Sequence, residues 1–407
     1  ETTIVATFKY SARDGTGRVV AGAIDAPSEV AVVAKLQEMG FYVTSLEEET
    51  QRVGLRGWIQ RLRGISLRDL TILFRQFSTM VSSGLSMLRT LSVLEVQTEN
   101  PRLRQIVADL RTDVQEGKSL SEATTRHPKT FSTLIISMIR AGEIGGVLDE
   151  ILQRVATFLE KDLALRQKVR SAVTYPIAIF IFAVGIIFFL VFFILPQFIG
   201  FFEELDVVLP APTRILIWFT RATTKYWYVI FGVIIGAIYL LRRYIATPAG
   251  RMRFDRFKLR VPILGPLVHK VTISRFSRTL ATLISSGVPI MQALEVVAGA
   301  VDNKIVTKAV EEVRTSIREG ESIALPLQAS GIFPPMVVQM TAVGEETGQL
   351  DGMLTKVADF YDAEVETTLA QLTSILEPVL ILFLGFVVGF IVLSFYLPLY
   401  TLITGIK

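Results

Sequence analysis

The stretch FRQFSTMVSSGLSMLRTL, residues 74–91, has a copy later in the chain, FSRTLATLISSGVPIMQAL at residues 276–294. The two Ser-Ser-Gly turns, at residues 82–84 and 285–287, fall in register. A repeat with so long a period is not a solenoid, whose units hold about 20 to 50 residues. The chain therefore carries a duplicated domain, and we expect two related partner surfaces on one molecule.

The match between the copies continues toward a long apolar segment in each. AGEIGGVLDEIL at 141–152 aligns with VGEETGQLDGML at 343–354, and Pro176 in the first apolar segment aligns with Pro378 in the second. The repeated unit is therefore a polar helical module followed by a membrane helix.

Composition indicates a membrane protein and excludes several kinds of chemistry. Hydrophobic residues make up 51% of the 407 residues, and the mean hydropathy is +0.48. The chain has no cysteine and two histidines, so it cannot form thiolate or multi-histidine metal sites. The net charge is +4, and no basic face interleaved with aromatic residues indicates nucleic-acid binding. We predict no enzyme activity, cofactor or metal.

Three segments are apolar enough to cross a bilayer, and we place membrane helices at residues 171–196, 220–241 and 375–400. Basic residues gather before the first of them and after the second, and such residues stay on the cytoplasmic side. The sequence therefore predicts a multi-pass membrane protein. Its N-terminus and both modules face the cytoplasm, while segment 197–219 and the tail 401–407 face the other side of the membrane.

The fold class is mainly α, with a small α+β domain at the N-terminus. Alternating residues predict a ββαβ unit over 1–49, and a basic linker over 50–66 that either lies on anionic lipid or is a solvated tether. Helical periodicity with breaks at glycine and proline predicts a six-helix bundle in each module, at 67–170 and 271–374. A basic connector, 242–270, precedes the second bundle.

Two sequence motifs predict helix starts. Ser66 with Asp69, and Ser119 with Glu122, have the spacing of capping boxes. The triplet 117–119 (Gly-Lys-Ser) is similar to the end of a phosphate-binding loop, but the preceding glycine that such a loop needs is absent. We therefore interpret Ser119 as a helix cap. The pairs Gly232 with Gly236, and Gly385 with Gly389, predict close packing between membrane helices.

Charged residues that match between the copies, or that mark the membrane boundary, are candidates for partner contacts. The Gly-Glu pairs at Glu143 and Glu345 precede the sixth helix, where a carboxylate either caps the following helix or meets a basic partner. Asp149 and Asp351 allow the same two interpretations. Glu377, at the mouth of the third membrane helix, either has a function there or lies among lipid headgroups. The basic connector adds Arg251, Arg253 and Arg256.

Taken together, these motifs resemble the PilC/GspF family of inner-membrane platform proteins from type IV pilus and type II secretion machines. The resemblance rests on the repeats at 82–91 and 285–294, on AGEIGG at 141–146 with VGEETG at 343–348, on AVTYPI at 172–177 and on ILEPVLI at 375–381. The ending FYLPLY, 395–400, is more similar to pilus members.

The resemblance implies a platform in the bacterial inner membrane, with segment 197–219 and the C-terminus in the periplasm, that couples a cytoplasmic hexameric ATPase to the insertion or extraction of pilin subunits during pilus biogenesis. Its implied partners are that ATPase, pilin or pseudopilin subunits, other inner-membrane components of the machine, membrane lipid and further copies of the chain in a dimer or larger assembly. One alternative is the equivalent platform of a type II secretion system. A transporter or channel is a further alternative, because transporters also contain internal repeats.

Overall fold

The computed structural model describes residues 6–13, 19–26, 29–40, 42–48, 64–204, 209–262, 264–301 and 303–405. Most of the predicted linker 50–66 and the last two residues of the tail lie outside these ranges. The chain divides into two units, the first comprising Glu1–Ile65 with Asn100–Arg102 and the second comprising Ser66–Glu99 with Leu103–Lys407.

The first unit holds a three-stranded antiparallel sheet and one helix. Its elements are β1 Ala6–Arg13, β2 Val19–Ala26, α1 Glu29–Glu38 and β3 Tyr42–Glu48, and the strand order is β2-β1-β3. Val32 and Leu36 of α1 are fully buried and pack on Tyr10, Ile24 and Val43 of the three strands. Burial of this apolar helix face holds the helix on the sheet.

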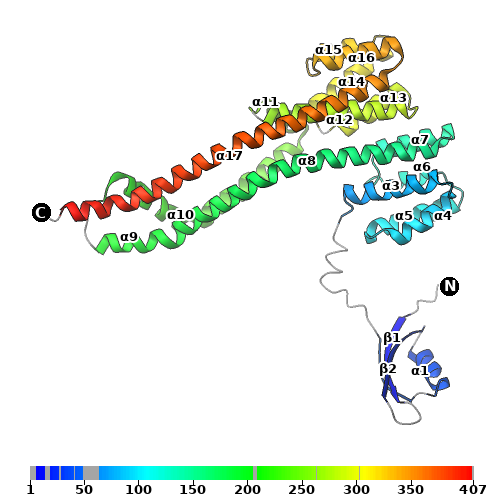
Figure 1. The fold of residues 1–407 in the computed structure, drawn as a ribbon, viewed down its shortest axis with the longest axis horizontal. Helices are drawn as coiled ribbons and strands as arrows, with labels where there is room; N and C mark the ends of the chain where they lie inside the picture. Colours follow the sequence, from blue (N-terminus) through cyan, green and yellow to red (C-terminus); the bar gives the residue numbers. More distant parts are fainter. Residues whose placement is uncertain are drawn as a thin grey trace. The chain divides into compact units, whose positions relative to one another are not determined.

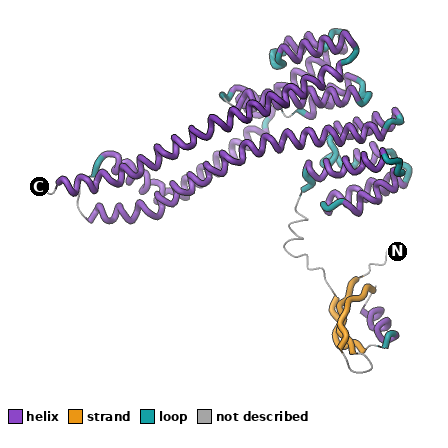
Figure 2. The backbone as a smooth tube through the Cα atoms, in the orientation of Figure 1, coloured by secondary structure: helices purple, strands orange, loops and turns teal. Residues whose placement is uncertain are grey.

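The second unit is helical and contains both repeats (Figures 1 and 2). The first repeat has the helices α3 Leu67–Ser82, α4 Met87–Gln97, α5 Pro101–Gln115, α6 Leu120–Thr125, α7 Thr133–Gly145 and α8 Leu148–Phe189. The second has α12 Leu264–Ser285, α13 Ile290–Ala300, α14 Lys304–Arg318, α15 Ala324–Ala329, α16 Pro335–Thr347 and α17 Leu350–Gly405. The helices follow one another in the same order in both repeats.

The turns between these helices also match. Gly146 ends α7 with φ 69°, and Gly348 ends α16 with φ 70°, a left-handed conformation that glycine adopts without strain. Both predicted capping boxes are confirmed: Asp69 and Glu122 each accept a hydrogen bond from the backbone N–H of their serine, at 2.9 and 3.2 Å.

Each repeat has an aromatic contact at its centre. The ring of Phe74 on α3 meets that of Phe131 edge-on at 6.1 Å, and the ring of Phe276 on α12 lies 4.7 Å from that of Phe333. All four side chains are buried. These contacts join the first helix of each repeat to the loop before its fifth helix.

The last helix of each repeat continues without interruption from the module into a long apolar segment. Among the described residues, three helical segments are long and apolar enough to cross a membrane: Leu148–Phe198, Ala211–Ala246 and Leu350–Pro398. The first includes a short π-helical stretch, Leu190–Ile194, before α9 Leu195–Glu204. Figure 1 shows α8 and α17 running beside one another, and their residues are in contact.

The helix α10, Ala211–Ala246, begins within the segment predicted to connect the first two membrane helices. Its first part packs on the apolar ends of the other two: Leu216 lies with Leu195 and Ile391 in one buried cluster. Thr213 donates a hydrogen bond to the backbone oxygen of Ser394 at 2.6 Å. The helix then kinks at Tyr226, where φ is −109° and ψ 18°.

The glycine pairs predicted to bring membrane helices together are not used for packing within the described part of the chain. No described atom lies within 4 Å of the position that a Cβ would take at Gly232, Gly236, Gly385 or Gly389. Those helix faces are open.

Candidate functional site

The contact between the two repeats centres on the parallel helices α8 and α17. Leu165 of α8 is buried with Val365, Leu369 and Leu372 of α17, and Leu267 of α12 completes the cluster. This apolar contact lies before the predicted membrane segments. It joins the two helices that lead into the membrane at the level where they leave their modules.

Two ion pairs run along the same contact. Lys161 Nζ lies 2.9 Å from Asp359 Oδ1, and Lys168 pairs with Glu366. In both pairs the lysine belongs to α8 and the carboxylate to α17, and the two pairs are two helical turns apart. Each side chain is about half exposed, so the pairs add little stability. Their main effect is to specify which faces of α8 and α17 meet.

A second kind of ion pair occurs at equivalent positions inside each repeat. Arg75 of α3 pairs with Glu160 of α8, and Arg278 of α12 pairs with Asp362 of α17. Arg278 also lies 3.0 Å from Asp359, the carboxylate that Lys161 reaches from the other repeat. Arg278 therefore links the packing of the second repeat to the contact between the repeats.

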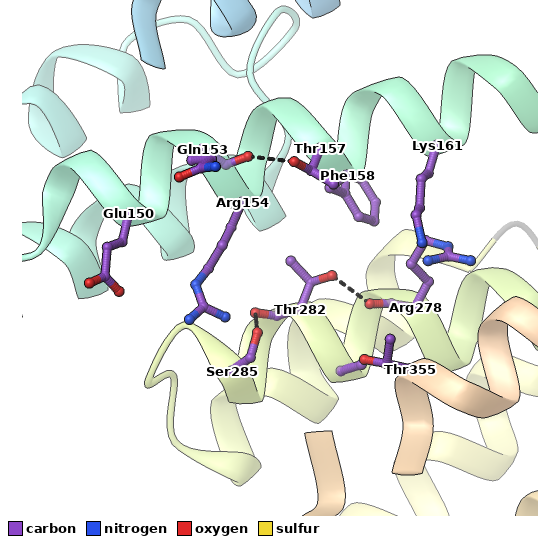
Figure 3. Close-up of a pocket in the computed structure, with 11 residues that line it drawn as sticks. Glu150, Gln153, Arg154, Thr157, Phe158, Lys161, Arg278, Thr282, Ser285 and Thr355 are labelled. Carbon is purple, nitrogen blue, oxygen red and sulfur yellow. Dashed lines mark hydrogen bonds between the residues drawn. The ribbon is translucent and has the colours of Figure 1, made fainter. Parts of the chain in front are cut away.

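Between α8, α12 and α17 lies an open groove of about 550 Å³ (Figure 3). Figure 3 shows Arg154 extending from α8 toward α12, and no described residue pairs with its side chain. Thr282 and Thr157 line the groove, but each donates its hydroxyl hydrogen to its own helix backbone. Among the described residues, the groove thus offers a ligand one unpaired cation, Arg154, and hydroxyl groups that can only accept hydrogen bonds. We therefore interpret it as a space between the modules and not as a binding pocket for a small ligand.

The structure corrects the expected role of the Gly-Glu motifs. Glu143 on α7 accepts hydrogen bonds from the backbone N–H groups of Leu120 and Ser121, at 2.5 and 3.2 Å, so it caps the preceding short helix α6. Glu345 accepts from the N–H of Ile323 at 3.1 and 3.0 Å, at the start of α15. The prediction that these carboxylates cap the following helix is wrong, because α7 and α16 fold back beside the short helices. Whether they also contact a partner stays a prediction.

The glycine of each motif has a separate packing role. A Cβ at Gly142 would lie 2.7 Å from the Ile151 side chain, and a Cβ at Gly344 would lie 2.8 Å from the Leu350 Cα. Any side chain there would separate the fifth helix from the start of the sixth. The motif therefore joins three helices in each repeat. The glycine allows the fifth helix to pack closely on the start of the sixth, and the glutamate of the fifth helix caps the short fourth helix.

The remaining predicted site residues lie on the surface, except Asp351, which is half-buried. Asp149 and Asp351 occupy the first turns of α8 and α17, where a carboxylate complements the helix dipole. Glu377 is exposed, one residue before Pro378. Within the described part of the chain, none of these three forms a hydrogen bond or ion pair with another predicted site residue.

The basic connector forms α11, Pro248–Arg260, on which Arg251, Arg253 and Arg256 are exposed. Asp255 of the same helix is buried and accepts a hydrogen bond from the backbone N–H of Lys304, at 3.0 Å, at the start of α14. This contact fixes α11 on the second repeat with its arginines facing outward. Sequence reasoning missed Asp255, although a single acid among many basic residues was a usable signal.

The first repeat has a charged cluster without an equivalent in the second. Asp113 is 2% exposed and receives Lys118 Nζ at 2.8 Å, and it also pairs with Arg126. The hydrogen bond from Lys118, together with that from Arg126, lowers the pKa of Asp113 below its ordinary value. Lys118, the lysine of the Gly-Lys-Ser triplet, is thus occupied by Asp113 and Glu116.

Known proteins match both repeats and the small first unit. Residues 73–196 and 276–398 each match the family described as type II secretion system (T2SS), protein F, and residues 5–47 match the N-terminal domain of that protein.

The matches to whole proteins extend over nearly the full chain. The chain is 44% identical over 398 residues to the type IV pilus assembly protein PilC of Thermus thermophilus, a match that covers 97% of this chain and 98% of that protein. It is 37% identical to the PilC protein of Myxococcus xanthus, over 99% and 96% of the two chains. It is 33% identical to type II secretion system protein F of Vibrio cholerae, over 97% and 98%.

Proposed function

Since this chain belongs to the type II secretion system protein F family, which includes type IV pilus assembly proteins, we propose that it is the inner-membrane assembly platform of a type IV pilus. In this role it couples a cytoplasmic hexameric ATPase to the insertion and extraction of pilin subunits. It acts without enzymatic activity of its own, and both modules and the N-terminal unit face the cytoplasm.

The observation that carries this proposal is the continuity of α8 and α17. Each begins in a module, at Leu148 and Leu350, and runs as one helix into a segment apolar enough to span the bilayer. A helix transmits displacement along its axis because every turn is hydrogen-bonded to the next. A partner that moves the modules would therefore move the membrane segments beside which pilin subunits lie.

The contact between the modules supports transmission to both membrane helices together. Lys161, Lys168 and the apolar cluster around Leu165 join α8 to α17 before the membrane. Displacement of one module should thus shift the other module's membrane helix. The exposed arginines of α11 and the carboxylates Glu143, Glu345, Asp149, Asp351 and Glu377 remain our candidates for contacts with the ATPase, with pilin or with neighbouring copies.

A helix-breaking insertion tests this coupling. Three glycines inserted after Arg170, between module and membrane, should abolish piliation while leaving the amount of protein in the membrane unchanged. Three alanines at the same place preserve the helix and serve as the matched control. If the glycine insertion supports normal pili, coupling through α8 is excluded.

Association with an ATPase tests the partner. We expect the full chain to co-purify with the assembly ATPase of its own organism and to raise its turnover. Failure to co-purify with any such ATPase, together with normal pili in a deletion strain, would contradict the proposal.

The platform of a type II secretion system is the second candidate, because the Vibrio cholerae relative carries that name and is similar over the whole chain. Loss of secreted enzymes with intact pili in a deletion strain would favour it. Ion or solute flux into liposomes that contain the purified chain would instead favour a channel or transporter.

A further inference from the structure

The first part of α10 has two unlike faces. Thr213, Leu216 and Thr220 are buried on one of them, and Leu216 packs on the membrane ends of the other two long helices. Arg214 and Lys225 are exposed on the other face, with Trp218 and Arg221 between them at helical spacing. We call these four residues the basic face of α10, and it points away from the protein.

The basic face ends where the uncharged part of the helix begins. After the kink at Tyr226, residues 226–241 contain no charged side chain, and almost all of them are exposed. A charged side chain is costly within hydrocarbon. The cations therefore lie outside the hydrocarbon, and Trp218 and Tyr226 beside them are of the residue types that gather at the level of the lipid headgroups.

The spacing along the helix gives the orientation of this segment. Arg214 and Lys225 are three turns apart, roughly 16 Å along the axis. If the segment stood upright with Lys225 at the headgroups, Arg214 would lie in water about 16 Å beyond them; with Arg214 at the headgroups, Lys225 would enter the hydrocarbon. Both cations stay among headgroups only if the segment lies along the membrane surface, and the kink at Tyr226 then turns the helix into the bilayer.

The charges on this face are incompletely neutralised by the protein. No described residue forms a hydrogen bond or ion pair with the Arg214 side chain. Lys225 Nζ lies 5.5 Å from the ring centre of Tyr226, a cation–π contact that leaves its charge in place. Between them is an open groove of about 610 Å³, lined also by Trp218, Ile217 and Arg221.

We propose that the basic face of α10 binds the phosphate groups of anionic phospholipids. Arginine and lysine donate charge-assisted hydrogen bonds to phosphate oxygens, and the groove continues into the apolar surface after Tyr226, along which acyl chains can lie. A soluble phosphate would gain nothing from that apolar surface, and an acidic protein segment would not need the adjoining bilayer. The bound lipids fix the depth of the kink, and through it the position of α10 against the other two membrane helices.

Quenching of Trp218 fluorescence by brominated lipids tests the proposal in the full chain. The chain has three tryptophans, so the changes Trp58→Phe and Trp227→Phe leave Trp218 as the single reporter. The protein is placed in nanodiscs of phosphatidylcholine that contain increasing fractions of brominated phosphatidylglycerol, or of brominated phosphatidylcholine as the neutral comparison. We expect phosphatidylglycerol to quench at lower mole fraction.

The variant Arg214→Gln/Lys225→Gln should need about tenfold more phosphatidylglycerol for half-maximal quenching. The control Lys308→Gln/Arg318→Gln removes the same charge from α14 and should leave quenching unchanged. Arg214→Lys/Lys225→Arg keeps both charges, so it should retain the preference even if the glutamine variant folds poorly.

Equal quenching by the two lipids would overturn the proposal. So would an unchanged preference in the glutamine variant, or an equal loss in the control. If the glutamine variant instead keeps the preference but no longer assembles into oligomers, the face binds protein and not lipid.

Discussion

Lys161 of the first repeat and Arg278 of the second bind the same carboxylate, that of Asp359, at 2.9 and 3.0 Å. Asp359 therefore belongs both to the internal packing of one module and to the contact between modules. Burial alone would raise the pKa of Asp359, but the hydrogen bonds from Lys161 and Arg278 outweigh it and lower the pKa below its ordinary value. If a rearrangement separates the modules, Asp359 loses its contact with Lys161. Arg278 then remains as the partner of both Asp359 and Asp362.

Removal of Lys161 should loosen the contact between modules with little loss of stability. The pair is half exposed, so Lys161→Ala should lower the free energy of unfolding by at most about 1 kcal/mol. Cross-linking between α8 and α17 should fall more strongly. It can be measured with cysteines introduced at Thr157 and Thr355, because the chain has no cysteine of its own. The swap Lys161→Asp/Asp359→Lys does not serve as rescue, since Arg278 also needs Asp359.

The two equivalent arginines should differ in their importance for stability. The Arg278 side chain is 11% exposed and that of Arg75 is 39% exposed. We expect Arg278→Ala to cost about 2 kcal/mol, because its buried guanidinium donates to two carboxylates that each lose one partner, and Arg75→Ala about 1 kcal/mol. Thermal denaturation of the full chain in detergent, followed by circular dichroism, measures both. Equal losses of stability in the two variants would show that the exposure of the arginine does not determine how much each ion pair contributes.

The glycines of the repeated motif should resist substitution. Gly142→Ala meets the flexible Ile151 side chain, and we expect a loss of about 1 to 2 kcal/mol. Gly344→Ala meets backbone and should cost more, about 2 to 3 kcal/mol. Gly352→Ala is the matched control, since no described atom lies within 4 Å of its Cβ position. The melting temperature should be lowest for Gly344→Ala, and that of Gly352→Ala should be at or slightly above the parent value, because alanine favours a helix more than glycine does.

The glutamates of the same motif test capping against partner contact. Glu143→Ala and Glu345→Ala should each lower the free energy of unfolding by about 1 to 2 kcal/mol, because backbone N–H groups lose their acceptor. Glu→Gln keeps an acceptor and should cost less. Charge reversal at each position is then scored separately for piliation. Equal defects would indicate that the two repeats present equivalent surfaces to their partners.

Asp113 should make the first repeat sensitive to acid. Its pKa is lowered in the folded state, so the stability that it contributes is present above the ordinary pKa of aspartate, about 4, and is lost as the pH falls through the lower folded pKa. Asp113→Asn should melt at lower temperature than the parent at pH 7, and the difference should shrink toward pH 3. A difference that is constant with pH would show that the charge of Asp113 contributes nothing.

Much of the fold could be predicted because it depends on local pattern and on the repeat. Helical periodicity, the serine caps and the matched glycine turns are properties of short stretches, and the membrane helices follow from uncharged length. The tandem helical repeats and the three apolar segments were predicted from these signals.

The contacts of the site depend on how distant helices fold together, and the sequence reveals them less directly. Glu143 was predicted to cap α8, because α8 is the next helix in the sequence. In the structure it caps α6, which lies beside it in space. The Arg75–Glu160 pair was missed, although its equivalent, Arg278–Asp362, occupies matched positions in the second copy. Charged residues of opposite sign that match in both copies were the available signal.

The lysines that join the modules have a consequence for which helices can pair with each other. At the positions equivalent to Lys161 and Lys168 the second repeat has Ala363 and Ala370, and at those equivalent to Asp359 and Glu366 the first has Thr157 and Ala164. Two α8 helices would bring like charges together, and so would two α17 helices. The two repeats are thus not interchangeable at this contact: α8 supplies the lysines and α17 the carboxylates, so these charges favour pairing α8 with α17 over pairing either helix with its own kind.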